Sequence, residues 1–302
     1  MNIRNKNKAI VHIGTMKVGT TSIQAYANRN KDRILQQNSC IWIPNGNRSG
    51  ISVTTVIEKN NASDCDVLMC DEGLWHFADT KKVDLDGIRA ALGSRYCQAV
   101  LYIREPVGFL QSWYLQGLKS GTGQPSFAKF LASPFVRRSL DFEERLPIFR
   151  KLFDEVTIRC FDKNTLVNHD AVADFMAFAG LDVTGNKPVG EKNVTTGPNR
   201  LMREHLRSKY GVSDKEIYTN CGAYVDWDDT CDIVYHEEVQ EILSTYEASY
   251  RYLEQYYGLN FEDFYQTSKR RDNSQSIREC FDLYIRGANT WNEDQKSRDP
   301  SP

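Results

Sequence analysis

The chain has 302 residues, of which 40% are hydrophobic and 26% are charged, and its formal net charge at pH 7 is −2. This ordinary globular mixture excludes the collagen-like, coiled-coil and wholly disordered classes. The near-neutral charge excludes a nucleic-acid binder that acts through a global basic field. No run of about 18 apolar residues is present, so no transmembrane segment is expected.

The cysteines and the first residues indicate a reduced, cytoplasmic protein. The opening MNIRNKNK lacks the apolar region of a signal peptide. None of the eight cysteines forms a CxxC pair, and their spacing matches no zinc-site pattern. Several of them lie in or beside apolar runs, where a reduced cysteine packs as a small hydrophobic side chain. Free thiols are therefore expected, and the alternative that the even count allows is a set of disulfides.

Short apolar runs alternate with longer amphipathic stretches in the first half of the chain. The runs are expected to be strands that are buried on both faces of a parallel sheet. They lie at 9–13, 41–43, 67–70, 99–103 and 156–160. The amphipathic stretches, expected to be helices, lie at about 20–37, 84–93, 106–120 and 138–152. This alternation predicts an open, doubly wound α/β sheet, in which ligands bind at the carboxyl ends of the strands.

The second half of the chain is expected to be mainly helical. Two turn-rich segments, Pro44–Asp64 and Asp182–Asn199, are expected to be surface loops, and a polar tail at 289–302 is expected to be disordered. Helices are expected at about 198–209, 234–257 and 276–288. The predicted organisation is one domain over 1–288, with an α/β core at about 8–181 and a helical part at about 197–288.

The strongest local signal is a glycine-containing loop between the first expected strand and the first expected helix. Residues 14–22 read GTMKVGTTS. A helix that begins after such a turn presents free backbone N–H groups to an anion, and Lys17 adds a positive charge. The residues expected to hold the anion are Lys17, Val18, Gly19, Thr20, Thr21 and Ser22.

This loop does not follow the pattern GxxxxGK[ST] of nucleoside-triphosphate-binding loops. In that pattern the lysine comes directly after the second glycine, whereas Lys17 precedes Gly19 by two positions. Glycine- and threonine-rich turns also open helices that bind no ligand. The loop alone therefore leaves phosphate binding undecided, and a second element is needed.

That second element follows the fourth expected strand. Arg104 closes the strand, Pro106 stands where the first residue of a helix is expected, and Ser112 lies eight residues after Arg104. A guanidinium binds phosphate through charge-assisted hydrogen bonds, and a hydroxyl can donate to the same group. The alternatives are an ion pair of Arg104 with Glu105 or Asp71, and a Ser112 that only lies on a helix surface.

The two motifs together resemble those of the sulfotransferases that use 3′-phosphoadenosine 5′-phosphosulfate, most nearly the bacterial-type carbohydrate sulfotransferases. KxGTTS at 17–22 is similar to the pattern with which this family grips the 5′-phosphosulfate. Arg104 and Ser112 are similar to its 3′-phosphate element. The match covers roughly residues 9–26 and 98–121.

This resemblance implies a three-layer α/β fold that is P-loop-like, with a central, mostly parallel sheet and a helical C-terminal extension. It also implies transfer of a sulfuryl group to an acceptor hydroxyl on a saccharide or glycolipid, with adenosine 3′,5′-bisphosphate as the second product. A transferring sulfuryl group carries less negative charge than a phosphoryl group, so no metal is expected. Two other functions stay open, namely a P-loop phosphotransferase or kinase and a non-catalytic nucleotide-binding protein.

The C-terminal part departs from the family. The RKGxxGxW nucleotide loop of the cytosolic small-molecule members is absent, and 269–271 matches it only in charge. The segment 247–254 resembles a family segment that contains Ser-Asn, but Tyr250 follows Ser249 here. No ligand role is assigned to either segment.

Sulfuryl transfer needs a base that takes the proton of the acceptor, and the end of the third expected strand offers two candidates. Glu72 falls on the Glu of a Ser-Ser-Glu-like turn of carbohydrate sulfotransferases, and partial desolvation can tune a Glu toward a neutral pKa. His76 is the alternative, because a His is the base in other branches of the family. Asp71 and Glu72 would otherwise only cap the following helix. Lys17 is implied to stabilise the charge on the bridging oxygen as the nucleotide leaves.

Overall fold

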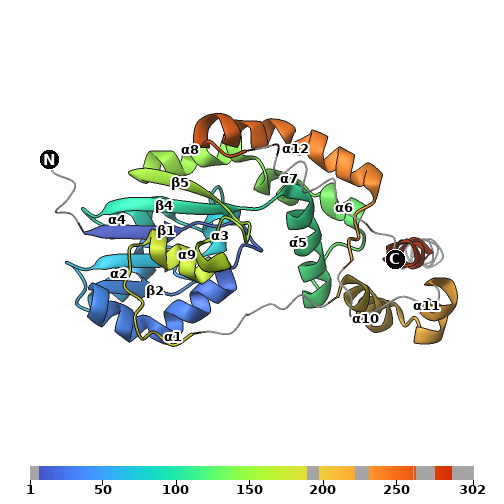
Figure 1. The fold of residues 1–302 in the computed structure, drawn as a ribbon, viewed down its shortest axis with the longest axis horizontal. Coiled ribbons are helices and arrows are strands. Elements are labelled where there is room, and N and C mark those ends of the chain that lie inside the picture. The colour runs from blue at the N-terminus through green and yellow to red at the C-terminus, as the bar shows by residue number, and fades with distance from the viewer. Residues whose placement is uncertain (1–6, 189–196, 222–230, 261, 263–275, 288–302) are drawn as a thin grey trace, which may run out of the picture. The chain divides into compact units, whose positions relative to one another are not determined.

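The computed structural model describes residues 7–188, 197–221, 231–260, 262 and 276–287 (Figure 1). The chain forms two compact units that interleave along the sequence. The first comprises 1–104, 139–193 and 248–261, and the second comprises 105–138, 194–247 and 262–302. The expected tail at 289–302 and the basic segment at 269–271 lie outside the described residues.

The first unit is built on a five-stranded parallel sheet with the order β2-β3-β1-β4-β5. Its strands are β1 (Lys8–His12), β2 (Cys40–Ile43), β3 (Asp66–Cys70), β4 (Tyr96–Ile103) and β5 (Glu155–Cys160). In the centre, Ile10 pairs with Leu68 of β3 and with Gln98 of β4. The five predicted strands and the predicted α/β fold class are confirmed. The apolar runs were informative because successive side chains point to opposite faces of a strand, and both faces are covered here.

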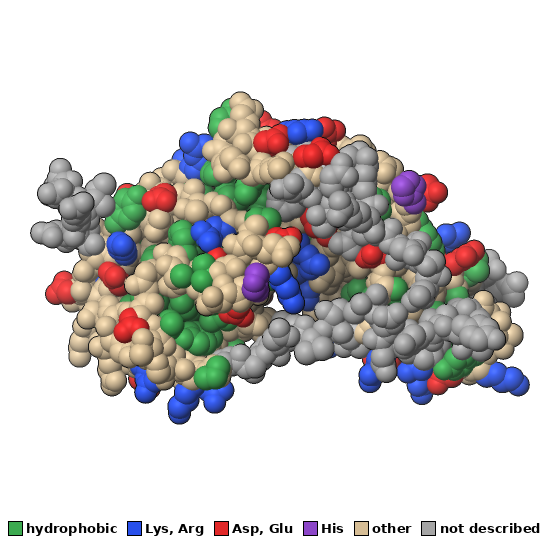
Figure 2. Space-filling model, in the orientation of Figure 1, with side chains coloured by type: hydrophobic (Ala, Val, Ile, Leu, Met, Phe, Trp, Pro, Cys, Tyr) green, Lys and Arg blue, Asp and Glu red, His purple; other side chains and the backbone are tan. Residues whose placement is uncertain are grey.

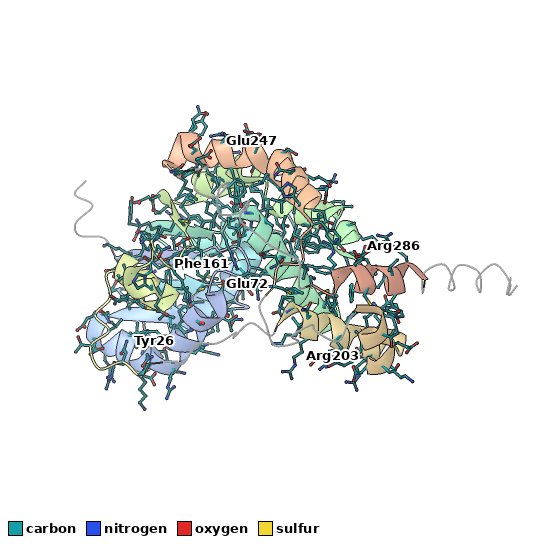
Figure 3. All side chains as sticks on the ribbon, turned by 45° about the vertical axis from the view of Figure 1, so that its right-hand side comes forward. Tyr26, Glu72, Phe161, Arg203, Glu247 and Arg286 are labelled. Carbon is teal, nitrogen blue, oxygen red and sulfur yellow. The ribbon has the colours of Figure 1, made fainter. Side chains whose placement is uncertain are left out.

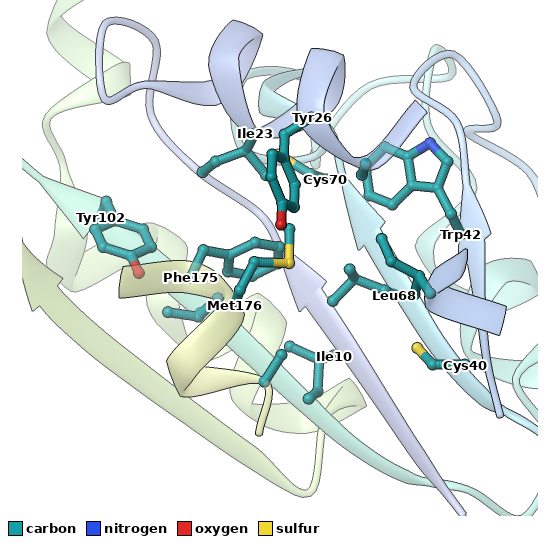
Figure 4. Packing of buried hydrophobic residues seen from close by; sticks show 14 of the residues in the cluster. Ile10, Ile23, Tyr26, Cys40, Trp42, Leu68, Cys70, Tyr102, Phe175 and Met176 are labelled. Carbon is teal, nitrogen blue, oxygen red and sulfur yellow. The ribbon is translucent and has the colours of Figure 1, made fainter. Parts of the chain in front are cut away.

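One face of this sheet is covered by α1 (Thr20–Asn38) and α9 (Ala171–Phe178), which lie side by side. Figure 4 shows the core that they form with the strands, in which Tyr26 of α1 and Phe175 of α9 pack near Ile10 and Leu68. On the other face lie α2 (Gly50–Lys59), α4 (Leu85–Ala91) and α8 (Phe142–Leu152), packed in a row. The sheet is therefore the middle layer of three.

A second aromatic cluster lies where α8 meets α3 (Glu72–Phe77). The ring of Trp75 stacks on that of Phe149 at a centroid distance of 5.6 Å and lies 5.7 Å from that of Phe142. The guanidinium of Arg145 lies 5.1 Å from the Trp75 ring centroid and donates to the Trp75 carbonyl. These contacts hold α3, which directly follows β3, against the body of the first unit.

The second unit is helical where it is described. It contains α5 (Pro106–Ser120), α6 (Phe127–Leu131), most of α7 (Pro134–Ser139), α10 (Pro198–Tyr210), α11 (Asp214–Cys221), the first half of α12 (His236–Tyr257) and a helix at 278–287. Its interior is organised around the buried Arg278, whose guanidinium pairs with Glu238 and with Asp282 and lies 4.3 Å from the Tyr235 ring centroid. The predicted helices at 198–209, 234–257 and 276–288 are confirmed to within a few residues.

Two of the predicted elements are wrong in detail. The expected loop Pro44–Asp64 contains the ten-residue helix α2 (Gly50–Lys59). Its β-branched sequence has a low helix propensity, but Ser49 and Ser52 form a capping box, and a Cβ on Gly50 would lie 2.5 Å from the Gly87 carbonyl oxygen of α4. Packing against α4 and the cap therefore outweigh the propensity.

The expected single helix at 138–152 is two helices. The first, α7, ends at Ser139, and α8 begins at Phe142 after Asp141, whose carboxylate accepts the Glu144 N–H at 3.1 Å. Asp141 is thus the N-cap of α8. The hydrophobic period is the same on both sides of the break, so the period alone predicted one continuous helix. None of the helices in the described part of the chain is long and apolar enough to span a bilayer.

Candidate anion-binding and catalytic site

The glycine-containing loop lies at the switch point of the sheet. The chain leaves β1 for β2 on one side and leaves β4 for β5 on the other, so the connections that follow these two neighbouring strands run in opposite directions. The loop follows β1, and Arg104 follows β4 directly. The Ile13 N–H donates to the Val100 carbonyl at 3.0 Å and continues the pairing of β1 with β4 up to the loop. The predicted position of both elements at this edge is confirmed.

Close packing requires both glycines of the loop. A Cβ on Gly14 would lie 2.1 Å from Cε1 of the buried His12 ring. Gly19 has a left-handed backbone with φ 77°, and a Cβ there would lie 2.6 Å from the Cβ of Ala171 and 3.3 Å from the Phe161 ring. The loop therefore lies directly on side chains of β1, α9 and the residue that follows β5, which only glycine permits.

Specific contacts hold the loop on both sides of Lys17. This residue has a left-handed backbone with φ 66°, a conformation that costs a non-glycine residue about 1–3 kcal/mol. Just before it, the Thr15 hydroxyl donates to the Tyr102 carbonyl at 3.1 Å, and the Met16 N–H donates to Nε2 of His76 at 3.2 Å. Just after it, the Val18 side chain is fully buried. The surrounding structure thus maintains the strained backbone of Lys17.

The N-terminus of α1 is arranged to receive an anion. Gly19 is the N-cap and offers no side-chain acceptor, and no acidic residue stands in the first turn of this 19-residue helix. Thr20 is buried, and its Oγ1 has no hydrogen-bond partner among the described residues. The first N–H groups of a helix carry partial positive charge, so this end favours a negatively charged group.

The formal net charge of −2 does not favour the binding of an anion to the molecule as a whole. On the face shown in Figure 2, basic and acidic side chains are interspersed, as expected for a net charge of −2. An anion at the loop is therefore expected to be attracted by local groups, namely Lys17 and the amides of α1, with Arg104 at the end of the neighbouring strand β4.

Asp71, the residue after β3, has a structural role. Its carboxylate accepts the Gly73 N–H at 2.8 Å and so caps α3. It also accepts two hydrogen bonds of 2.8 Å from the Arg48 guanidinium and one of 2.8 Å from the Gly46 N–H. For Asp71, the expected alternative of a helix cap is confirmed. Because Arg48 stands 23 positions before Asp71, their hydrogen bonds tie the segment before α2 to the start of α3.

Glu72, the first residue of α3, is different (Figure 3). It is half-buried, and its Oε2 is buried without a hydrogen-bond partner among the described residues. Burial raises the pKa of Glu72, and the charge of Asp71 adds to this, whereas a backbone hydrogen bond and the charges of Arg48 and Lys17 oppose it. A carboxylate with an unpartnered oxygen and a raised pKa is a stronger base than an ordinary Glu side chain and can accept a proton.

Replacing Glu72 by Gln is expected to stabilise the folded protein at neutral pH. A carboxyl whose pKa is raised on folding stabilises the fold below its unfolded pKa, and this contribution is lost as the pH rises through the folded value. Because Gln does not ionise, the unfolding temperatures of Glu72→Gln and wild type should be similar at about pH 4, with the variant higher at about pH 7. Thermal denaturation at both pH values measures this, and a less stable variant at neutral pH would contradict the raised pKa.

His76, the other candidate base, is turned toward the loop. It is 2% exposed, its Nε2 accepts the Met16 N–H at 3.2 Å, and its Nδ1 lies 2.9 Å from Oγ of Ser139. Burial, together with the positive charge of Arg145, lowers the pKa of His76 to about 3. The ring is therefore neutral, and both of its nitrogens are engaged with protein groups.

The structure places the two residues of the second motif in different units. Arg104 is half-buried at the end of β4 in the first unit, and Ser112 is half-buried on α5 in the second. Their joint action on one phosphate stays a prediction. Sequence reasoning missed a support for Arg104, since the hydroxyl of Tyr250 donates to the Arg104 carbonyl at 2.7 Å. Tyr250 is the residue that departs from the Ser-Asn pattern, so this departure has a structural role here.

No family model and no curated protein matches the chain. Among solved structures, it is similar to a sulfotransferase from Alicyclobacillus acidocaldarius, with a TM-score of 0.48 and 12% sequence identity, over 85% of this chain and 98% of that one. This likeness is too remote to carry an argument about function.

Proposed function

We propose that the chain is a sulfotransferase that moves a sulfuryl group from 3′-phosphoadenosine 5′-phosphosulfate to an acceptor hydroxyl. One observation carries the proposal, namely the groups at the ends of the three neighbouring strands β3, β1 and β4. They are, in this order, the carboxylate of Glu72, whose Oε2 has no partner among the described residues, the glycine-containing loop with Lys17, and the cation Arg104. A base, a phosphosulfate cradle and a phosphate ligand are the groups that this reaction needs.

In the proposed reaction, the N–H groups of the loop and the hydroxyls of Thr20, Thr21 and Ser22 bind the 5′-phosphate. The acceptor oxygen forms a bond to sulfur while the bond between sulfur and the bridging phosphate oxygen breaks. Glu72 takes the proton of the acceptor hydroxyl, and Lys17 neutralises the charge that develops on the bridging oxygen. The products are a sulfate ester and adenosine 3′,5′-bisphosphate.

The remaining parts of the proposal concern the 3′-phosphate and the acceptor. Arg104, with Ser112, is proposed to bind the 3′-phosphate, which distinguishes this nucleotide from ATP. The proposed acceptor is a saccharide or glycolipid hydroxyl, and its support is the resemblance of the two motifs to bacterial-type carbohydrate sulfotransferases. The proposed reaction includes no metal, because the sulfuryl group carries less charge than a phosphoryl group.

A thermal-shift titration tests this proposal against a phosphotransferase of similar fold. Adenosine 3′,5′-bisphosphate is expected to raise the unfolding temperature, and ATP with Mg²⁺ is not. Lys17→Ala and Arg104→Ala should each weaken binding of the bisphosphate by about tenfold or more, since each removes a charge-assisted contact. Lys31→Ala, at an exposed position of α1, is the matched control. Stabilisation by ATP with Mg²⁺ alone, or unchanged affinity in both variants, would overturn the proposal.

A transfer assay tests the acceptor class. Labelled sulfate from 3′-phosphoadenosine 5′-phosphosulfate is offered to glycans, glycolipids and small alcohols, and incorporation into the saccharide-containing members is expected. Incorporation into the small alcohols alone would contradict a saccharide acceptor but would support the sulfuryl transfer. Nucleotide binding without transfer to any acceptor would favour the non-catalytic alternative.

A further inference from the structure

His76 links α3 to the glycine-containing loop through two hydrogen bonds of defined direction. The Met16 N–H can only donate, so Nε2 of His76 must accept, at 3.2 Å. A neutral imidazole that accepts at Nε2 carries its proton on Nδ1. Nδ1 lies 2.9 Å from Oγ of Ser139, whose hydroxyl oxygen can accept that proton. The Met16 N–H therefore selects the tautomer of His76 with its proton on Nδ1, and Ser139 accepts that proton.

The environment maintains this arrangement. His76 and Ser139 are each 2% exposed. The backbone of α3 is held at the other end by Asp71, whose carboxylate caps the helix and binds Arg48. The His76 ring thus projects from an anchored element onto the loop.

The residue that His76 holds is next to the strained one. Lys17, with φ 66°, follows Met16, and a non-glycine residue leaves the left-handed region unless its neighbours prevent it. The Thr15 hydroxyl and the buried Val18 side chain hold the loop on either side. The Met16 N–H bond to His76 fixes the peptide unit between Thr15 and Met16, one unit before the Met16–Lys17 peptide, and so restrains the start of the strained segment.

We propose that His76 is a positioning residue, which holds the loop in its anion-binding conformation before the nucleotide arrives, and that Ser139 holds the His76 ring in place by accepting its Nδ1 proton. The ligand named in the test rests on the proposed function, whereas the ordering of the loop does not. A preordered loop binds its anion with less loss of conformational entropy, so loosening it weakens binding without removing any group that contacts the ligand.

Two substitutions at the same position separate positioning from general damage. In His76→Gln, the side-chain amide reaches the place of Nε2 and can accept the Met16 N–H. In His76→Asn, the shorter side chain reaches only the place of Nδ1, toward Ser139. His76→Ala removes both bonds, Ser139→Ala removes only the hydrogen bond at Nδ1, and His236→Ala, at an exposed position of α12, is the surface control.

Two measurements are made on the full chain. Calorimetry gives the affinity for adenosine 3′,5′-bisphosphate, and hydrogen exchange without ligand gives the protection of residues 14–19. His76→Ala and His76→Asn are expected to weaken binding by about five- to tenfold, the range of one lost hydrogen bond, and His76→Gln by less than about threefold. Exchange in 14–19 should rise in the Ala and Asn variants and stay near wild type in Gln and in His236→Ala. Ser139→Ala should give intermediate values of both.

Equal affinity and equal exchange in wild type, His76→Ala and His76→Asn would overturn the inference, and so would a Gln variant that behaves like Ala. If His76→Ala does not fold, the inference is tested by Ser139→Ala and by the comparison of His76→Gln with His76→Asn. If the wild type binds no bisphosphate, the proposed function fails, while exchange in 14–19 still shows whether His76 orders the loop.

Discussion

Replacing Glu72 by Gln is expected to reduce sulfuryl transfer by about 100- to 10,000-fold while leaving the affinity for adenosine 3′,5′-bisphosphate unchanged, because general-base catalysis contributes about this factor. Gln has nearly the same shape as Glu but accepts no proton. The Oε2 of Glu72 has no partner among the described residues, so the substitution breaks no hydrogen bond of that atom. Initial rates with labelled co-substrate give the loss of transfer, and calorimetry gives the affinity.

A control and a pH profile sharpen this result. Glu58→Gln, at an exposed position of α2, should keep full activity. In the wild type, the rate should rise with pH as Glu72 loses its proton, with a midpoint above the ordinary Glu value of 4.5, because burial raises the pKa of Glu72. This rise of the rate with pH should be absent from the residual activity of Glu72→Gln. Full transfer by Glu72→Gln would mean that another group takes the proton.

Replacing Gly14 by Ala is expected to lower the free energy of unfolding by about 1–3 kcal/mol or more, as overpacked cores do, and to weaken binding of the bisphosphate. The new Cβ would lie 2.1 Å from Cε1 of His12. This ring has little freedom to move, because it is fully buried, stacks on Tyr102 at a centroid distance of 5.2 Å and meets the edge of Phe175 at 5.5 Å. The loop must therefore shift, together with the amides that are proposed to bind the anion.

A double-mutant cycle tests the cause. The free energy of unfolding is measured by denaturant titration for Gly14→Ala, for His12→Ala and for both together. Removing the ring relieves the clash, so the double variant should be less destabilised than the sum of the two single variants by about 1 kcal/mol or more. Gly287→Ala, where a Cβ would meet no atom within 4 Å, should change stability little. Additive effects of the two substitutions would show that the clash is not the cause.

The sheet and the loop could be predicted because local patterns report burial. The apolar segment 9–13 reads as a strand covered on both faces, and β1 is such a strand. The glycines at 14 and 19 mark a turn before a helix, and α1 begins at Thr20. By contrast, α2 (Gly50–Lys59) was expected to be a loop, because its β-branched residues disfavour a helix that packing against α4 nevertheless stabilises.

The different roles of Asp71, Glu72 and His76 at the end of β3 could not be predicted in the same way. From the sequence, Asp71 and Glu72 are two adjacent carboxylates, and His76 is a second candidate for the base. In the structure, Asp71 is held by Arg48, 23 positions earlier, and His76 lies against Ser139, 63 positions later. By contrast, Oε2 of Glu72 has no hydrogen-bond partner among the described residues.

The motifs in the sequence thus predicted which charged and polar groups follow the strands, because their spacing from the apolar runs fixes which residues come after each strand. Only the tertiary structure decided which of these side chains are engaged by protein partners and which carboxylate oxygen has no partner among the described residues. The reason is physical: the pKa of a side chain and its hydrogen bonds depend on burial and on partners that the fold brings from distant parts of the chain, such as Tyr250 beside Arg104, 146 positions away.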